Sequence, residues 1–373
     1  MDLHPFGLQF TLTPETNMNT ITYDVLEIGD RMVDNRGTVI GFELENGSSY
    51  KIITMLGAGT YGKTFKVVDK NSKHYALKYL KPKRISGLIQ ECIIQILLAE
   101  CSKDQPNGPY VPQLYTVAYN PLFHEAYVIT ELMEDTLHDV IKYEEEETNE
   151  MILKDALFQI VNMLIFLGEK LKFNHRDLKP DNIMYIEKNG KYIFKFIDFG
   201  FSCVTWNGLQ ISADPYFTTC YKKDRDFSQL LYAIARSPDI YPLTEQFSHF
   251  IRTLLRANLL QSKKTCKILK GCDKEGLKNW KNSYTFFNRL NVRVPLANMY
   301  TSKKLLERYI QGFPISEEPS YGNFQSSVNA FSKGILRNPP LAVTRKQNPQ
   351  NPKKLYRNTR KINTKLIQKT YEP

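Results

Sequence analysis

The chain has 373 residues, of which 42% are hydrophobic and 12% aromatic, so it can bury a sizeable core and is not disordered as a whole. Its formal net charge is +11, but residues 333–373 hold eleven Lys or Arg and one acidic residue, which leaves the rest nearly neutral. This segment also contains three Asn-Pro pairs. We interpret it as a mobile basic tail that contacts nucleic acid, an acidic partner or nothing.

Composition also excludes several classes of protein. No apolar run approaches the roughly 18 residues of a membrane span, and the N-terminus lacks the basic and apolar regions of a secretory signal. The cysteines are scattered without a C-x-x-C pair, so a zinc or redox site has little support. We therefore expect reduced thiols in an intracellular protein of the cytoplasm or nucleus. The cysteines are Cys92, Cys101, Cys203, Cys220, Cys266 and Cys272.

The first half of the chain is predicted to be rich in β-strands. Residues 1–48 mix short apolar runs with turn signals and predict an N-terminal extension with a few short strands. Residues 85–101 then form a long apolar pattern that predicts a helix. The other β-prone runs are 52–56, 65–68, 74–80 and 126–130.

The second half is predicted to be mainly helical. An acidic run at 144–147 indicates a solvated loop or helix face, and residues 151–173 show the spacing of a buried helix. Two short β-prone runs, 183–186 and 192–197, flank Asn189-Gly190, which is a strong hairpin signal. Residues beyond Asp226 read as helical, with a closing helix over 302–310, and there is no internal repeat.

A glycine-rich loop at residues 57–64 reads Gly-Ala-Gly-Thr-Tyr-Gly-Lys-Thr and fits two phosphate-binding motifs. One is Gly-x-Gly-x-x-Gly, and the other is the Walker A pattern of P-loop NTPases. A Walker A loop opens a helix, whereas Phe65 to Val68, a turn and Tyr75 to Lys78 predict a β-hairpin. The hairpin favours a glycine loop that covers nucleotide phosphates from between two strands.

Three further motifs follow in a fixed order. They are Ala76-Leu77-Lys78, then His175-Arg176-Asp177-Leu178-Lys179-Pro180-Asp181-Asn182, and sixteen residues later Asp198-Phe199-Gly200. Together with the glycine loop, this set resembles the eukaryotic-type protein kinases, Ser/Thr branch, over roughly residues 50–260. The resemblance implies an α+β, bilobal protein-kinase fold with a β-rich N-lobe and a mainly α-helical C-lobe. It also implies ATP and Mg²⁺ as cofactors.

The resemblance assigns a role to each matching residue. Asp177 would orient the substrate hydroxyl, and Lys179 would bind the moving γ-phosphate, as in Ser/Thr rather than tyrosine kinases. Asn182 and Asp198 would hold Mg²⁺ through oxygen atoms. Lys78 would bind the α- and β-phosphates. The implied phosphate-loop residues are Leu56, Gly57, Gly59 and Gly62.

The nucleotide site needs two more groups of residues. A carboxylate must fix Lys78, and we choose Glu91, with Glu100 of the same predicted helix as the alternative. Residues 128–133 resemble the strand that leads into the kinase hinge. Thr130 would be the gatekeeper there, and the backbones of Glu131 and Met133 would bond the adenine edge. Ala76 would line the roof of the adenine site and Met184 its floor.

The sequence departs from the family pattern at three places. Thr64 replaces a valine near the third glycine, which makes the adenine roof more polar. No Ala-Pro-Glu follows residue 200, the nearest trace being 213–215, and the segment up to Asp226 is short. This activation segment is either switched by phosphorylation, with Arg176 as the phosphate partner, or preset without a switch. Its hydroxyl residues are Ser202, Thr205, Ser212, Thr218 and Thr219.

We therefore divide the chain into an extension (1–48), a kinase N-lobe (49–131), a hinge and C-lobe (132–332) and the basic tail (333–373). Trp280, Tyr284, Phe286 and Phe287 are expected to pack on the C-lobe. The chain is rich in Asn, Lys, Ile and Tyr, which suggests a large DNA virus as its source and a host cell or virion as its location.

The predicted function is a Ser/Thr protein kinase that phosphorylates proteins and does not act at a membrane. A pseudokinase scaffold that binds ATP without efficient turnover is the alternative, favoured slightly by the missing Ala-Pro-Glu. A small-molecule kinase of related fold ranks third. A P-loop NTPase ranks fourth, and it would need a helix at Phe65 to Val68.

Overall fold

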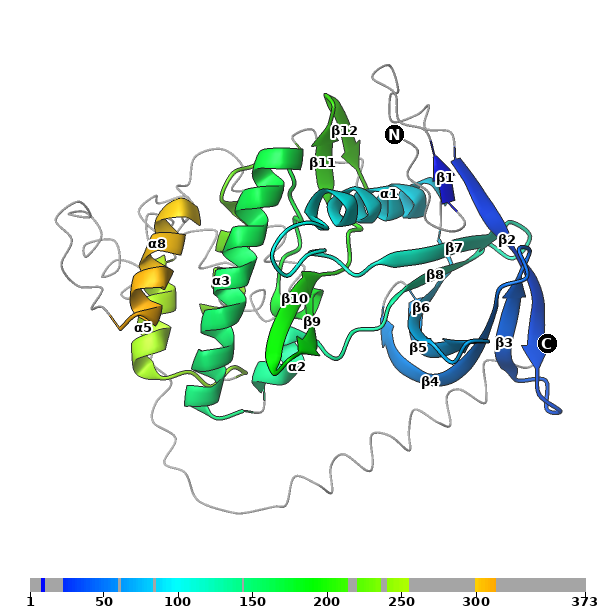
Figure 1. The fold of residues 1–373 in the computed structure, drawn as a ribbon, viewed down its shortest axis with the longest axis horizontal. Coiled ribbons are helices and arrows are strands. Elements are labelled where there is room, and N and C mark those ends of the chain that lie inside the picture. Colours follow the sequence, from blue (N-terminus) through cyan, green and yellow to red (C-terminus); the bar gives the residue numbers. More distant parts are fainter. Residues whose placement is uncertain are drawn as a thin grey trace, which may run out of the picture.

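The computed structural model describes residues 8–10, 23–59, 62–82, 85–142, 144–213, 220–235, 240–254 and 299–312. The predictions for residues 255–298 and for the basic tail lie outside these ranges. Strands fill the part of the chain before residue 132, and most of the helices follow it, as predicted for an α+β protein (Figure 1).

One sheet of eight strands makes up the first part, in the order β1-β2-β3-β4-β5-β6-β8-β7. Neighbours pair antiparallel, and β2 also pairs in parallel with β7 through Leu26–Ala118 and Glu27–Tyr119, so the sheet closes into a barrel. The strands are β1 (Leu8–Phe10), β2 (Tyr23–Val33), β3 (Val39–Leu44), β4 (Ser49–Gly59), β5 (Gly62–Asp69), β6 (His74–Leu80), β7 (Leu114–Asn120) and β8 (Glu125–Glu131).

The strands of the predicted extension, residues 1–48, are part of this barrel. β2 has 11 residues, and β2 and β3 belong to the same sheet as the glycine-loop strands. The barrel interior is apolar and aromatic, with the Phe42 ring 4.6 Å from that of Tyr127 and 5.5 Å from that of Tyr50. Burial of these large rings stabilises the closed sheet.

A charged cluster joins β2 to the start of β8. Glu125 at the start of β8 is buried and pairs with Arg31 of β2. It also lies 3.4 Å from Lys81 Nζ and accepts a hydrogen bond of 2.7 Å from the Tyr79 hydroxyl. Because a buried carboxylate is costly without partners, this cluster depends on β2 lying beside the β7–β8 pair.

Replacing Glu125 with Gln is expected to lower the free energy of unfolding by about 2 kcal/mol, because Arg31 and Lys81 lose their carboxylate partner. Urea denaturation of the purified chain measures it. Glu43→Gln, at an exposed position of β3, is the matched control and should change stability by less than about 0.5 kcal/mol. Equal effects of the two substitutions would contradict a role for the cluster.

The second part of the chain is built around the long helix α3. The helices are α1 (Ile85–Ser102), α2 (Leu137–Lys142), α3 (Glu146–Leu171), α4 (Arg225–Ala235), α5 (Glu245–Leu254) and α8 (Met299–Ile310), with a 3-10 turn η1 at Pro180–Asn182. Two hairpins accompany them: β9 (Ile183–Lys188) with β10 (Lys191–Phe196), and β11 (Cys203–Trp206) with β12 (Leu209–Ser212). The predicted turn at Asn189-Gly190 is confirmed, with φ of 54° and 72°.

Two helices correct the expectation about apolar length. α1 and α3 are long and apolar enough to cross a membrane by length and composition alone. In the structure, 61% of the apolar stretch of α1 and 56% of that of α3 is buried inside the fold. Core helices pass the same test, so these two are weak evidence for a membrane span.

The cysteines bring a second correction. Cys203 and Cys220 form a disulfide, so the expectation of reduced thiols is wrong for this pair. Cys92 and Cys101 are free thiols. Cys266 and Cys272 lie outside the described residues.

Candidate active site

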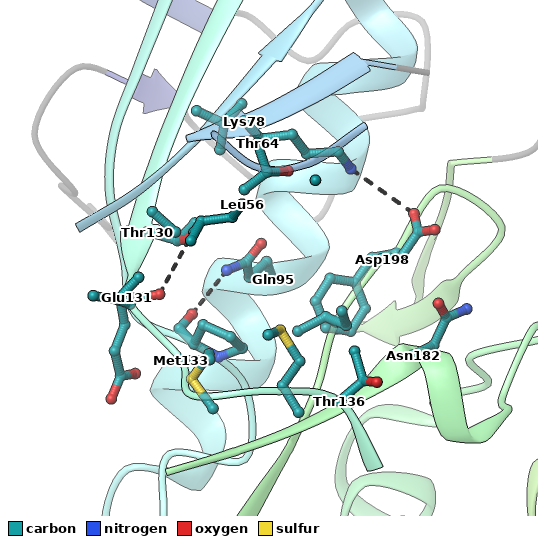
Figure 2. A pocket seen from close by; sticks show the side chains of 18 of the residues that line it. Leu56, Thr64, Lys78, Gln95, Thr130, Glu131, Met133, Thr136, Asn182 and Asp198 are labelled. Atoms are coloured by element: carbon teal, nitrogen blue, oxygen red, sulfur yellow. Dashed lines mark hydrogen bonds and ion pairs between the residues drawn. The ribbon is translucent and has the colours of Figure 1, made fainter. Parts of the chain in front are cut away.

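A pocket of about 610 Å³ lies between the barrel and the β9–β10 hairpin, a volume suited to a small ligand (Figure 2). Strands β4 to β6 form its roof, α1 its back, and the segment after β8 its side. The predicted site residues in its lining are Leu56, Gly57, Ala76, Lys78, Glu91, Thr130, Glu131, Met133, Asn182, Met184 and Asp198, and Thr64 lies among them.

The glycine loop joins β4 to β5, which pair from Tyr50–Asp69 to Gly59–Gly62. Phe65 to Val68 is therefore a strand, and the P-loop alternative, which needed a helix there, is wrong. The glycines differ in what they permit. A Cβ at Gly62 would lie 2.1 Å from the Tyr79 carbonyl oxygen, so strand packing requires this glycine. A Cβ at Gly57 or Gly59 would meet nothing within 4 Å, so space for a ligand remains there.

Lys78 on β6 is the main cation of the pocket. Its Nζ lies 3.2 Å from Glu91 Oε1 of α1 and 3.9 Å from Asp198 Oδ1. Burial alone would lower the pKa of Lys78, but Glu91 and Asp198 outweigh it and hold the pKa above its ordinary value. Lys78 is therefore charged throughout the physiological range. Glu100, the alternative partner, instead pairs with Lys103, which directly follows α1.

The predicted hinge follows β8. Thr130 pairs across the sheet with Ala76, which places the two side by side at the pocket wall. The N–H of Glu131 donates to the Gln113 carbonyl at 2.8 Å, so this N–H is used within the fold. The Thr130 hydroxyl lies 3.4 Å from the Glu131 carbonyl oxygen (Figure 2).

The Glu131 side chain points away from the pocket, and its carboxylate is held by Lys195 and by the Gln113 N–H (Figure 2). Lys195 Nζ of β10 lies 2.6 Å from Glu131 Oε2, and only 4% of the Lys195 side chain is exposed. The N–H of Gln113 donates to the same oxygen at 3.1 Å. These contacts fix the first hinge residue to both parts of the chain.

The two partners of this pair are expected to differ in how much stability they contribute. Glu131→Gln should cost about 2 kcal/mol, because it leaves the buried Lys195 ammonium without a counter-charge. Lys195→Met should cost about 1 kcal/mol, because Glu131 keeps the Gln113 N–H and reaches water. Urea unfolding of both variants tests this, with Lys191→Met at an exposed position of β10 as control. The reverse order would contradict the argument.

The predicted catalytic loop lies across the pocket from Lys78, where Asn182 is part of the lining. Asp177 is buried, and its Oδ2 accepts from Lys179 Nζ at 3.1 Å and from Asn182 Nδ2 at 3.0 Å. Asn182 Nδ2 also donates to the Asp177 carbonyl at 2.8 Å. These bonds hold the three side chains together as one cluster.

Asp226 at the start of α4 supports this loop. Its carboxylate is buried and accepts from the backbone N–H of His175 at 2.7 Å and of Arg176 at 2.9 Å. Arg176 and Asp198 adopt left-handed backbone, with φ of 68° and 64°. Such conformations are unfavourable for these residue types and cluster at functional sites.

The oxygen atoms of the pocket fit a hard divalent cation. Because the amide nitrogen of Asn182 donates to Asp177, its amide oxygen stays available as a ligand. The Asp198 carboxylate is half exposed and faces the pocket (Figure 2). A carboxylate and an amide oxygen are ligands that Mg²⁺ prefers.

Sequence reasoning missed several lining residues. Gln95 lies one helical turn after Glu91 and donates to the Pro112 carbonyl at 2.8 Å, and the spacing along α1 was the available signal. Thr136 donates to Asp139 Oδ2 at 2.7 Å at the pocket edge. Burial raises the pKa of Asp135, the Thr136 N–H partly offsets this, and Asp139 adds to the rise. No sequence signal singled out Asp135, Thr136 or Asp139.

The activation segment starts as the β11–β12 hairpin. Ser202 and Ser212 are buried, Ser202 donating to the His175 carbonyl at 3.2 Å and Ser212 accepting from Arg176 at 3.1 Å. This arrangement favours the preset alternative over a phosphorylation switch at these two serines. Thr218 and Thr219 lie outside the described residues.

Comparison with known proteins agrees with this geometry. Residues 50–223 match the family model of the protein kinase domain. Serine/threonine-protein kinase SBK1 of Danio rerio is 29% identical over 161 residues, 42% of this chain and 39% of that protein. Serine/threonine-protein kinase PknA of Nostoc is 30% identical over 156 residues, 40% and 27% of the two chains. A probable cyclin-dependent kinase 8 of Dictyostelium discoideum is 26% identical over 221 residues, 57% of each.

The match over residues 50–223 and the Ser/Thr kinase relatives support the eukaryotic-type protein kinase superfamily. The matches cover less than two thirds of the length of each of these relatives. The comparisons therefore identify a protein kinase domain over residues 50–223 and relatives that are Ser/Thr kinases.

Proposed function

We propose that this protein is an ATP-dependent Ser/Thr protein kinase that transfers the γ-phosphate of Mg-ATP to protein hydroxyls. One observation carries the proposal: Lys78, paired with Glu91, faces Asp198 in the same pocket that Asn182, which is hydrogen-bonded to Asp177, helps to line. Phosphoryl transfer demands positioning and charge neutralisation more than covalent chemistry, and this cluster offers both.

Each residue would have a distinct task. Lys78 would neutralise the α- and β-phosphates, with Glu91 holding its ammonium in place. Asp177 would accept a hydrogen bond from the substrate hydroxyl and orient it toward the phosphorus atom. Lys179, 3.1 Å from Asp177, would stabilise charge on the transferred group. Asn182 and Asp198 would hold Mg²⁺, which neutralises phosphate charge when it is bound.

The adenine ring would lie between Ala76 and Met184, against the Glu131 carbonyl and the Met133 backbone. Thr64 supports a slightly more polar roof than the family pattern has. Ser/Thr acceptors are supported by Lys179 and by the names of the relatives. We also propose that the protein acts inside a cell and comes from a virus. Residues 333–373 would contact nucleic acid or an acidic partner.

The test is transfer of labelled γ-phosphate from Mg-ATP to a basic protein and to a Ser/Thr peptide pool, followed by acid hydrolysis and identification of the phosphorylated amino acid. Phosphoserine or phosphothreonine is the expected product. ATP binding without transfer by a folded chain would favour the pseudokinase alternative. Labelling of a small metabolite in place of protein would favour the small-molecule kinase.

A further inference from the structure

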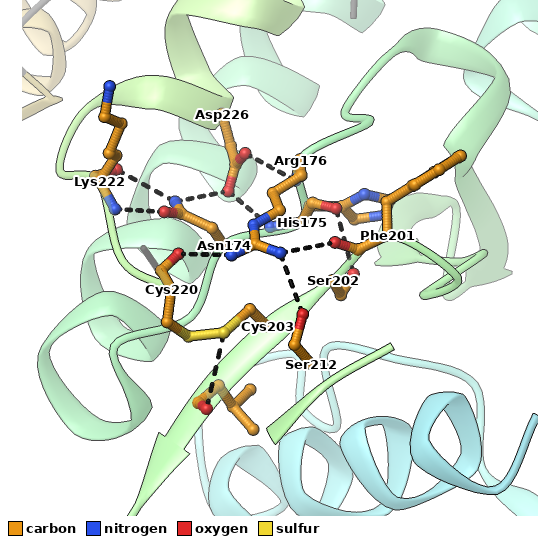
Figure 3. Close-up of a disulfide and its surroundings, with 11 residues drawn as sticks. Asn174, His175, Arg176, Phe201, Ser202, Cys203, Ser212, Cys220, Lys222 and Asp226 are labelled. Atoms are coloured by element: carbon orange, nitrogen blue, oxygen red, sulfur yellow. Dashed lines mark hydrogen bonds between the residues drawn. A yellow bond between two sulfur atoms is a disulfide. The ribbon is translucent and has the colours of Figure 1, made fainter. Parts of the chain in front are cut away.

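The segment that follows Gly200 is closed by a covalent bond near both of its ends. Cys203 opens β11, Cys220 lies shortly before α4, and their Cα atoms are 5.5 Å apart (Figure 3). Both residues are buried, with exposed fractions of 0% and 5%. The disulfide therefore joins two chain segments at the base of the activation segment.

Each half of this disulfide is bonded to the catalytic loop. The backbone N–H and carbonyl of Cys203 pair with those of Asn174, each at 2.9 Å. The Asn174 side chain donates to the Lys222 carbonyl at 3.1 Å and accepts from the Lys222 N–H. Asn174 therefore ties together the same two segments that the disulfide joins.

Arg176 bridges the two segments a second time. Its side chain is fully buried and donates to the Phe201 carbonyl at 3.4 Å, to Ser212 Oγ at 3.1 Å and to the Cys220 carbonyl at 3.3 Å (Figure 3). These acceptors are neutral, and one of them is the carbonyl of a bonded cysteine. Displacement of Cys220 would remove one acceptor of Arg176, which directly precedes Asp177.

The other two cysteines in the described ranges behave differently. Both are free thiols, and burial raises the pKa of Cys92 and of Cys101, which disfavours their thiolate forms. The core around α3 is built by apolar packing. The single disulfide of the described residues lies beside the catalytic loop. Loss of this bond would therefore change how the loop positions a protein substrate.

We propose that Cys203 and Cys220 form a reversible redox switch: the disulfide holds the activation segment against the catalytic loop, and reduction loosens it. This inference rests on the proposed kinase function. The oxidant would be a small-molecule disulfide such as oxidised glutathione. One protein thiolate attacks it and expels a glutathione thiolate, and the second protein thiolate then displaces the other. One oxidised glutathione is reduced to two thiols, which take up the two protein protons, while the cysteines lose two electrons.

The switch should act on protein substrate and not on ATP. Lys78, Glu91 and the hinge make no contact with either cysteine in the described hydrogen bonds and ion pairs, whereas Arg176 and Asn174 do. Reduction is expected to raise the KM for a protein substrate about fivefold to tenfold. The KM for ATP should change less than about twofold.

The experiment equilibrates the full chain at defined ratios of reduced to oxidised glutathione. Alkylation and peptide mass spectrometry measure the fraction of the Cys203–Cys220 disulfide, and initial rates give both KM values. In the wild type, the KM for the protein substrate should fall as the disulfide fraction rises. Cys220→Ser should have the high KM at every ratio, and Cys101→Ser, a free thiol near the end of α1, should respond as wild type does.

Amide hydrogen exchange of β11 and β12 tests the switch independently of turnover. Slower exchange in the oxidised chain supports it, even if no phosphate is transferred and the proposed function fails. The proposal is overturned if the disulfide never forms or cannot be reduced in the native chain. It is also overturned if the KM for protein and the exchange rates are the same in both states.

Discussion

Asp177→Asn is expected to lower kcat for phosphate transfer about a thousandfold, while the Kd for ATP changes less than about threefold. The amide keeps the size of the side chain but cannot accept the hydroxyl proton. It also weakens the bonds that Asp177 Oδ2 accepts from Lys179 and Asn182. Initial rates with labelled ATP and equilibrium nucleotide binding measure the two effects separately.

The matched control for this substitution is Asp155→Asn. Asp155 lies on α3, and its carboxylate accepts from Gln159 on the same helix, far from the pocket lining. It should retain the wild-type kcat. Full activity of Asp177→Asn would refute the role of Asp177, and an equal loss in both variants would point to general unfolding.

Lys78→Met is expected to lower kcat/KM for ATP about a hundredfold or more, because the pocket loses its preorganised cation. Glu91→Gln should have a smaller effect, about tenfold, because the amide oxygen still accepts from the ammonium at a distance near 3.2 Å. The order of the two effects follows from the geometry. Lys78 faces the ligand space, whereas Glu91 acts by holding Lys78 in place.

Steady-state kinetics with varied Mg-ATP measure both variants, with Lys66→Met on the neighbouring strand β5 as the control. Thermal unfolding establishes that each variant is folded. If Glu91→Gln were more damaging than Lys78→Met, Glu91 would have to contact the reacting groups itself. Loss of activity in Glu100→Gln would restore the alternative partner that the structure pairs with Lys103.

Local patterns in the sequence correctly predicted much of the fold. The glycine loop lies between β4 and β5 because β-prone residues flank it on both sides. The apolar spacing of residues 151–173 predicts most of α3, and Asn189-Gly190 predicts the β9–β10 turn. In each case the deciding interactions are between residues close in sequence, so composition and spacing are sufficient.

The candidate site was predictable where a short motif carries several of its residues. Asp177, Lys179 and Asn182 are neighbours in sequence, and a 3-10 turn brings them together. Asp135 and Asp139 reach the pocket only because the segment after β8 packs beside it. Gln95 could have been inferred from its spacing to Glu91, but only the fold shows that this face of α1 points inward.

The sequence by itself determined much of the order of strands and helices, the glycine loop and the cluster of Asp177, Lys179 and Asn182, because these depend on local propensity and short spacing. Only the tertiary structure decided the closure of the barrel by β2 and β7, the choice of Glu91 over Glu100, and the bond between Cys203 and Cys220. Each of these joins residues that are distant in sequence or equivalent in type. Their pairing depends on where the chain returns in space, which is set by packing of the whole core.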